Sequence, residues 1–173
     1  MKLDEIKKYY NLEFVAEKVI KLKTIDFKNK KPYYNFLTFD DYKIKGLDLN
    51  ILVSEEEYIC GKYIICIPTD NDCYEKKMEL PTEQDVIEYL NEELDNKEKM
   101  CFEISGDRYL EIHRCDDGWD YTIYDSNYKD IDGGVLCNPE YNLLRALETF
   151  KQDFIPKKYK FGNLKPIDYL EEI

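Results

Sequence analysis

Short runs of alternating apolar residues, separated by turn-forming residues, constrain the fold of this chain more than any other feature. Phe102–Ile104, Tyr109–Cys115, Trp119–Tyr124 and Asp130–Leu136 follow one another in this way. Alternation with a period of two residues indicates β-strands with one buried face. Parallel neighbours would need a crossover of about a dozen residues or more, and the connections here are much shorter. The pattern therefore predicts an antiparallel meander.

The turns of this meander predict which residues lie opposite one another. A two-residue Asp117-Gly118 loop is a strong hairpin signal, and it places Ile112 opposite Ile123. A three-residue turn before it pairs Ile104 with Leu110. Both registers put the large apolar residues on one face, which we expect to be the core face. Its residues are Leu110, Ile112, Trp119, Tyr121 and Ile123.

The remainder of the chain predicts helices and further strands. Apolar residues at helical spacing predict a helix over Leu12–Leu22, with Asn11 as its N-cap. Thr82 and Asn138 are the expected N-caps of two further helices, which reach to about residues 97 and 154. Pro166–Ile173 is expected to form a short helical turn. The predicted strands of the N-terminal half lie within 33–39, 47–53, 58–67 and 74–80. The strand at 47–53 is expected to be half-buried, the one at 58–67 to be covered on both faces with Gly61 as a possible bulge, and the one at 74–80 to be an edge strand.

These elements predict an α+β fold of mostly antiparallel β-meanders packed against two or three helices. Strands 47–80 with the helix after them resemble strands 101–136 with their helix in layout, which leaves a pseudo-duplication open. At 173 residues the chain can bury a substantial core. We expect one domain over residues 1–173, with 1–98 and 99–173 as candidate subdomains.

The charge of the chain limits its partners. It carries 25 Lys and Arg against 37 Asp and Glu, a formal net charge of −12 at pH 7. Gripping nucleic-acid phosphates needs a basic face, so direct nucleic-acid binding is not expected. A membrane span is not expected either. The acidic surplus fits a solubilising surface. It also fits a surface that imitates DNA phosphates and captures a basic protein.

The cysteines point to reduced thiols rather than to disulfides or a metal. No two of the six cysteines have Cys-x-x-Cys spacing, and the chain has one histidine, His113. Met1–Tyr10 is charged and lacks the apolar core of a signal peptide. We therefore expect a cytoplasmic protein with no metal and no cofactor. The cysteines are Cys60, Cys66, Cys73, Cys101, Cys115 and Cys137.

Candidate site residues gather around the second hairpin. His113 lies on the strand face opposite the core, beside Glu111 and Cys115, and such a cluster could be nucleophilic or metal-binding. No nucleophile motif accompanies it, so a solvent-side histidine is favoured. Gly133-Gly134 predicts a sharp turn or bulge with positive φ, which could also let a partner backbone approach. The candidate binding residues are His113, Asp116, Asp117, Asp120, Tyr124, Asp132, Gly133 and Gly134.

Two adjacent runs carry a resemblance to a known family. Residues 119–125 read WDYTIYD and residues 128–136 read YKDIDGGVL. Together they resemble a large polyvalent protein-associated domain of phages and of conjugative elements of Gram-positive bacteria, over residues 101–154. Cys137 stands where the family pattern has an aspartate. The resemblance implies an accessory, non-enzymatic domain of a mobile element and brings no catalytic residues.

Three functions remain open from the sequence. The first is a non-enzymatic accessory factor of a bacterial mobile element that binds a protein, and the acidic chain makes a basic protein the partner of most interest. The second is an acidic DNA mimic or immunity-type inhibitor, of the anti-restriction, anti-CRISPR or antitoxin kind. The third is a hydrolase that uses His113 and a nearby carboxylate.

Overall fold

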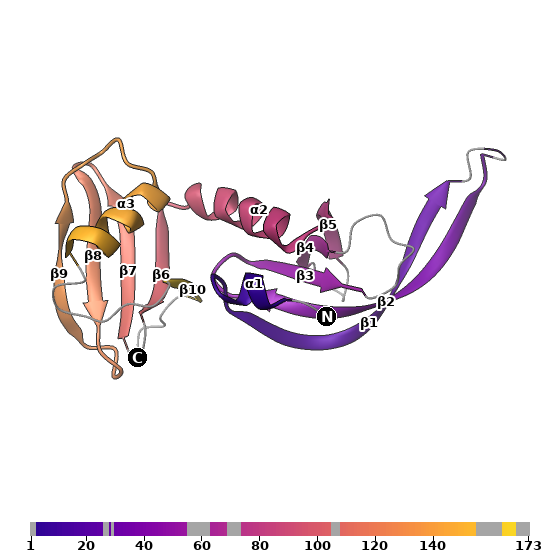
Figure 1. Cartoon of the computed structure of the whole chain (residues 1–173), viewed down its shortest axis with the longest axis horizontal. Coiled ribbons are helices and arrows are strands. Elements are labelled where there is room, and N and C mark those ends of the chain that lie inside the picture. Colours follow the sequence, from indigo (N-terminus) through magenta and orange to yellow (C-terminus); the bar gives the residue numbers. More distant parts are fainter. Residues whose placement is uncertain are drawn as a thin grey trace.

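The computed structural model of the chain describes residues 3–25, 28, 30–54, 63–68, 74–104, 108–154 and 164–168. Within these residues, two five-stranded antiparallel sheets and three short helices make up the fold (Figure 1). The expected α+β class is therefore confirmed. The first half holds α1 (Asp4–Lys7), β1 (Leu12–Ile25), β2 (Pro32–Ile44), β3 (Leu49–Val53), β4 (Tyr63–Pro68), β5 (Tyr74–Leu80) and α2 (Glu83–Asp95). The second half holds β6 (Lys99–Ile104), β7 (Arg108–Cys115), β8 (Gly118–Tyr124), β9 (Asp130–Leu136), α3 (Leu143–Thr149), a π-helical segment (Phe150–Phe154) and β10 (Lys165–Ile167).

The first sheet contains the largest departure from the sequence prediction. Residues 12–25 form the long strand β1 instead of a helix, and β1 pairs with β2 from Leu12↔Ile44 to Ile25↔Pro32. Val15 is 49% exposed, although a helical stripe would have buried it. The apolar spacing fits a strand as well as a helix once β2 offers its edge, so tertiary context decides. Asn11 caps no helix. Its side chain donates hydrogen bonds to Glu103 Oε2 (3.2 Å) and to the Pro166 carbonyl (3.3 Å).

The strands β3 and β4 are buried on both faces of the first sheet, whose order is β1-β2-β3-β4-β5. The half-buried strand expected at 47–53 is thus wrong in its burial, because Asn50 and Leu52 are buried as well. Asn50 Nδ2 donates to the buried Asp41 carboxylate (2.8 Å), and Lys18 Nζ lies 3.5 Å from that carboxylate. Residues 58–62 of the next expected strand, Gly61 among them, lie outside the described residues. β5 is an edge strand, as expected.

The second sheet has the order β10-β6-β7-β8-β9, and its meander lies where the sequence predicted it. Both predicted registers are wrong by two residues. Cys115 pairs with Gly118 around an Asp116-Asp117 loop, so Ile112 lies opposite Tyr121 rather than Ile123. Ile104 pairs with Arg108 rather than with Leu110. A loop displaced by one residue along the chain shifts each pairing by two residues and leaves every side chain on its face. The predicted core face is therefore correct.

The predicted N-cap of α2 is correct. α2 begins after Thr82, whose Oγ1 accepts a hydrogen bond from the Asp85 amide (3.1 Å), as predicted. It ends at Asp95, before the expected 97. Its buried residues are Val86, Ile87, Leu90 and Leu94.

The expected cap at Asn138 is wrong. α3 begins after Asn142, whose Oδ1 accepts a hydrogen bond from the Arg145 amide (3.0 Å). The side chain of Asp95, at the end of α2, also accepts a hydrogen bond from the Leu144 amide (3.1 Å) at this helix start. Asn138 instead stabilises the preceding turn by accepting a hydrogen bond from the Glu140 amide (3.2 Å). A second polar contact at the later position thus moves the helix start by one turn.

The chain after residue 164 also differs from its prediction. The expected helical turn at Pro166–Ile173 is replaced by β10, which pairs antiparallel with β6 through Pro166↔Phe102 and Ile167↔Cys101. Residues 169–173 lie outside the described part of the chain. β6 has one edge that β7 does not use, and this edge gives the segment partners for its backbone hydrogen bonds. Because β6 lies far away in the sequence, the residues around Pro166 do not reveal this pairing.

One hydrophobic cluster runs through both halves of the molecule. It joins Ile51 of β3, Leu90 of α2, Phe102 of β6 and Phe150 beyond α3. In Figure 1, α2 bridges the two sheets, and α3 lies over one face of the second sheet. The consecutive strands β1 to β5 are followed by α2 and the consecutive strands β6 to β9 by α3, a layout in keeping with a duplication. One domain over residues 1–173, with 1–98 and 99–173 as candidate subdomains, stays a prediction. None of the described helices is long and apolar enough to cross a membrane.

Candidate functional site

The solvent-facing side of β7, β8 and β9 brings several predicted site residues together. A shallow pocket of about 520 Å³ lies there, which we call the β9 groove. It is lined by His113 of β7, by residues 120–122 of β8 and by residues 130–135 of β9. Five of the eight predicted binding residues line it: His113, Asp120, Asp132, Gly133 and Gly134. The other three do not. Asp116 and Asp117 form the exposed hairpin turn, and the Tyr124 hydroxyl donates to Glu111 Oε2 (3.5 Å).

The β9 groove is acidic. Asp120, Asp130 and Asp132 contribute three carboxylates to its lining. His113 Nε2 lies 3.2 Å from Asp120 Oδ2, and the two side chains are 45% and 38% exposed, so water screens their interaction. Beside the groove, burial raises the pKa of Tyr124, and the carboxylates of Glu111 and Asp130 raise it further. This electrostatic environment favours a cationic ligand.

The glycine pair lies inside a strand, which corrects its predicted role. Gly133 and Gly134 belong to β9, and neither has positive φ. A Cβ on Gly134 would lie 3.0–3.2 Å from the Tyr121 ring and hydroxyl, and one on Gly133 would lie 3.1 Å from the Tyr121 carbonyl oxygen. The Tyr121 ring in turn packs edge-on against Phe150, with ring centroids 4.7 Å apart. Gly134 therefore makes room for an aromatic ring that anchors β8 beneath the segment after α3.

The outer edge of the second sheet is the main feature that sequence reasoning missed. β9 is the last strand of the sheet, and among the described strands it pairs only with β8. It presents two apolar side chains to solvent, Ile131 (42% exposed) and Val135 (45% exposed). The sequence did contain a signal for this apolar edge. The last strand of a meander lies at the edge of its sheet, and the apolar residues at 131 and 135 share one face of that strand.

The four-stranded meander, the helix after it and β10 form one contiguous structural unit, and this unit coincides with the family comparison. Residues 95–172 match the family model of large polyvalent protein-associated domain 16. Such domains are typical of the polyvalent proteins of mobile elements. No curated protein and no solved structure matches the chain.

The match confirms the resemblance and extends it. The sequence resemblance spans residues 101–154, whereas the polyvalent protein-associated domain reaches from the end of α2 to residue 172. The structure explains the extension, because β10 completes the second sheet by pairing with β6. Pro166 and Ile167, which were expected to lie in a helical turn, thus belong to a strand of the domain.

Among the described residues, no group of three or more His, Cys, Asp or Glu is arranged to hold a metal ion. The β9 groove contains one aliphatic hydroxyl, Thr122, and no cysteine. Of the six cysteines, four are described and carry no disulfide, and Cys60 and Cys73 lie outside the described residues. In the first sheet, burial and the Asp41 carboxylate raise the pKa of the Cys66 thiol to about 12.

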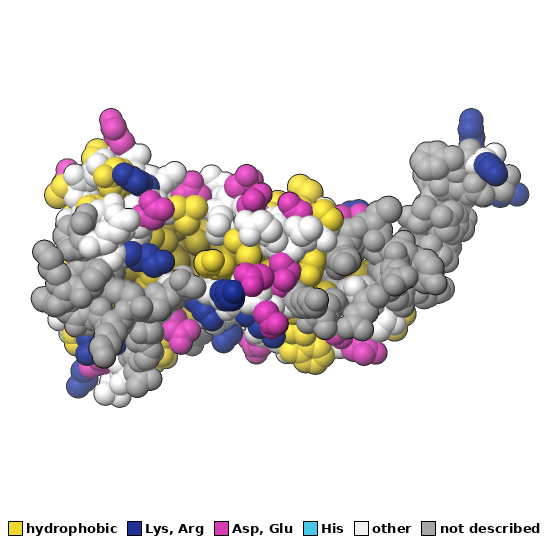
Figure 2. All heavy atoms as spheres, in the orientation of Figure 1, with side chains coloured by type: hydrophobic (Ala, Val, Ile, Leu, Met, Phe, Trp, Pro, Cys, Tyr) yellow, Lys and Arg dark blue, Asp and Glu magenta, His cyan; other side chains and the backbone are white. Residues whose placement is uncertain are grey.

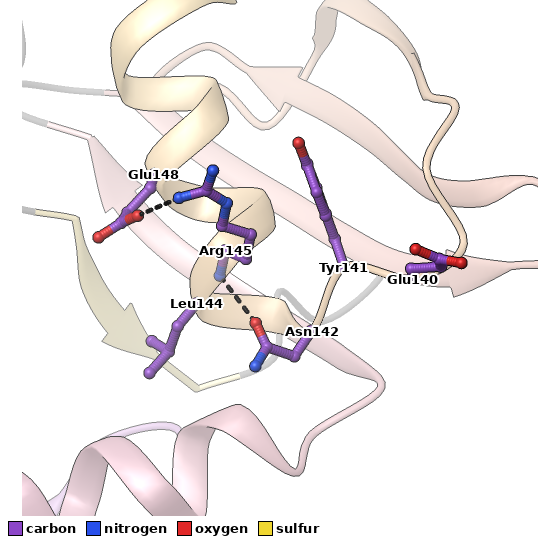
Figure 3. Close-up of a pocket in the computed structure, with 6 residues that line it drawn as sticks. All are labelled: Glu140, Tyr141, Asn142, Leu144, Arg145 and Glu148. Carbon is purple, nitrogen blue, oxygen red and sulfur yellow. Dashed lines mark hydrogen bonds and ion pairs between the residues drawn. The ribbon is translucent and has the colours of Figure 1, made fainter.

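A second hollow of the domain, at the start of α3, serves the helix itself (Figure 3). It has a volume of about 350 Å³. Figure 3 shows Asn142 directed at the Arg145 backbone and the Arg145 side chain directed at Glu148, and the latter pair is 3.3 Å apart. Behind it, Trp119 Nε1 donates to the Tyr141 carbonyl (2.8 Å). These polar groups satisfy one another, so the hollow is a capping structure.

Proposed function

We propose that this protein is a non-enzymatic accessory factor of a bacterial mobile element and that it binds an extended, basic segment of another protein along β9. The observation that carries the proposal is the exposed outer edge of β9, with Ile131 and Val135 on its surface and three aspartates beside it. The polyvalent protein-associated domain supports the link to mobile elements.

An edge strand can take up an extended peptide by backbone pairing. The backbone groups on the outer side of β9 supply affinity, and side chains at every second position supply specificity. Ile131 and Val135 offer apolar contacts to residues of the added strand. A peptide in this position would continue the second sheet as its sixth strand.

The three aspartates of the β9 groove indicate which side chains the bound segment of the partner carries. Asp120, Asp130 and Asp132 lie along the groove, so lysine or arginine side chains of the added strand would meet carboxylates. Exposed charges at the rim of an interface mainly raise the association rate of the two proteins, and salt weakens their attraction. The interaction is therefore expected to be salt-dependent, and its partner is expected to be a basic protein.

Contacts in the site and elsewhere on the described surface favour binding over the other two functions. A hydrolase needs a nucleophile within hydrogen-bond reach of its base, whereas the described contact of His113 Nε2 is with the Asp120 carboxylate, in an open, shallow groove. A DNA mimic needs acidic residues free of neighbouring cations, but Lys8 pairs with Glu5 and Lys76 pairs with Glu79, each at 2.8 Å. Figure 2 shows acidic and basic side chains interspersed over the described surface of the body on this side.

The test is capture of partners from a lysate of the host by the immobilised full chain. Val135→Lys places a positive charge on the edge of β9 and should abolish capture of any protein bound there. Val15→Lys is the matched control, because Val15 is 49% exposed on β1, the edge strand of the first sheet. Mass spectrometry at low and at high salt identifies what each variant retains.

The proposal expects a basic protein that the wild type and Val15→Lys capture at low salt. Val135→Lys should lose it, and high salt should weaken its capture by the wild type. Capture that is the same for both variants would contradict binding along β9. Turnover of a substrate that depends on His113 would contradict the non-enzymatic reading.

A further inference from the structure

The hairpin of β1 and β2 continues beyond the first sheet as a two-stranded arm. β2 pairs with β3 only from Asp40 to Ile44, whereas its pairing with β1 continues outward from Lys18↔Phe39 to Ile25↔Pro32. We call residues 18–39 the arm. At about 3.3 Å per residue, the eight outer pairs extend about 26 Å from the sheet. Figure 1 shows this arm projecting away from the rest of the molecule.

The arm carries the opposite charge to the rest of the chain. Residues 18–39 hold six lysines and one aspartate, a net charge of +5 within a chain of net charge −12, which leaves −17 elsewhere. Lys28, Lys30 and Lys31 near its outer end are exposed. Figure 2 shows basic side chains gathered at that end. The whole-chain charge that argues against phosphate binding therefore averages over two regions of opposite sign.

Distance separates the charge of the arm from that of the body. At physiological ionic strength the Debye length is about 8 Å, so an arm of about 26 Å spans about three Debye lengths. The lysines at its end are thus screened from the acidic body. A polyanion can reach them without being repelled by the remaining acidic surface.

We propose that the lysines at the end of this arm bind the phosphate backbone of duplex DNA. A duplex presents one negative charge per about 1.7 Å of its axis, a denser and more regular array than an acidic protein surface offers. The major groove of B-form DNA admits a two-stranded β-ribbon, which is the shape of the arm. Lysines act on phosphates as point charges and read no bases, so the binding is independent of sequence. This surface is separate from the β9 groove.

The lysines of the arm could serve two other roles, and evidence for either role in place of DNA binding would overturn this proposal. Lysines on exposed strands also prevent edge-to-edge aggregation. The acidic body of a second copy of this chain is a possible partner for the arm as well, because its charge is complementary. Both roles predict effects of arm substitutions that do not involve DNA.

The experiment measures fluorescence anisotropy of a labelled, mixed-sequence duplex of about 20 base pairs, titrated with the full chain. The test variant is Lys28→Glu/Lys30→Glu/Lys31→Glu. The matched control is Lys77→Glu/Lys129→Glu/Lys151→Glu, which changes the net charge equally at three exposed lysines of the body. Both variants should melt like the wild type, because none of the six lysines contributes to the hydrophobic clusters. Sedimentation of each protein alone reports self-association and aggregation.

The wild type and the control variant should bind the duplex at low salt. Three phosphate contacts give a log–log salt slope of about −2.7, which is a loss of about 40-fold in affinity between about 50 and about 200 mM salt. The arm variant should bind at least about tenfold more weakly, with a slope closer to zero by about that amount. No binding by the wild type, or equal losses in both variants, would overturn the proposal. An arm variant that binds DNA normally but changes its sedimentation would also overturn it, in favour of a second copy or of protection against aggregation.

Discussion

At the scale of single residues, close packing of the backbone explains why position 118 is a glycine, which the rule for hairpin turns does not. Gly118 has φ +143°, and a Cβ there would overlap the Leu136 carbonyl oxygen and approach the Asn138 amide nitrogen at 2.6 Å. The sequence marks Asp117-Gly118 as a hairpin loop, yet Gly118 is the first residue of β8. Its lack of a side chain admits the backbone that leaves β9, and this contact was not visible in the sequence.

The first prediction follows from that contact. Gly118→Ala should lower the free energy of unfolding by about 3 kcal/mol, because both the backbone angle and the Leu136 backbone oppose a Cβ. Gly134→Ala should cost less, since a Cβ there meets the side chain of Tyr121, which can shift. Urea denaturation of both variants measures the difference. Equal losses of unfolding free energy in the two variants would contradict the role given to the Leu136 backbone contact.

At the scale of elements, local signals predicted the meander of the second sheet, α2 and the presence of α3, but not β1, β10 or the start of α3. The strands of the meander and the cap at Thr82 are encoded within a few residues of each other. β10 pairs with β6, which is far away in the sequence, and β1 pairs with β2 along a hairpin so long that Leu12 lies opposite Ile44. For the site, the sequence placed His113 on the outer face correctly. The prediction missed Ile131 and Val135, although their exposure follows from the place of β9 at the end of the meander.

The cap of α3 gives the element-scale prediction. Asn142→Ala removes the acceptor for the Arg145 amide and should cost about 1 kcal/mol of stability. Asn142→Ser keeps an oxygen at the cap and should cost less. Thermal unfolding followed by circular dichroism compares the two. An alanine variant as stable as the serine variant would contradict the assignment of Asn142 as the N-cap.

At the scale of the whole molecule, contacts between the halves hold the β9 groove and the arm on one body. Asp168, just after β10, accepts a hydrogen bond from the Gly46 amide (3.0 Å) and lies 3.1 Å from Lys43 Nζ. Partial burial opposes ionisation of this carboxyl, but the Gly46 hydrogen bond and Lys43 outweigh it and lower the pKa of Asp168. The ionised form is therefore the one that stabilises the junction.

This junction has a defined pH dependence. A lowered pKa means that the contribution is complete above the ordinary value of 3.8 and is lost as the pH falls through the lower folded value. Asp168→Asn should cost about 0.5–1 kcal/mol at neutral pH, a small amount because the pair is about half exposed. Its difference from the wild type should shrink below about pH 4. A difference that grows on acidification would have the wrong sign.

The central claim is that β9 is the binding edge, and hydrogen–deuterium exchange tests it most directly. The full chain is measured alone and with the partner that it captures. We predict that amides of β9 gain the strongest protection, because an added strand pairs with their outer side. Protection that falls on β1 or β5, the edge strands of the first sheet, and leaves β9 unchanged would contradict the account.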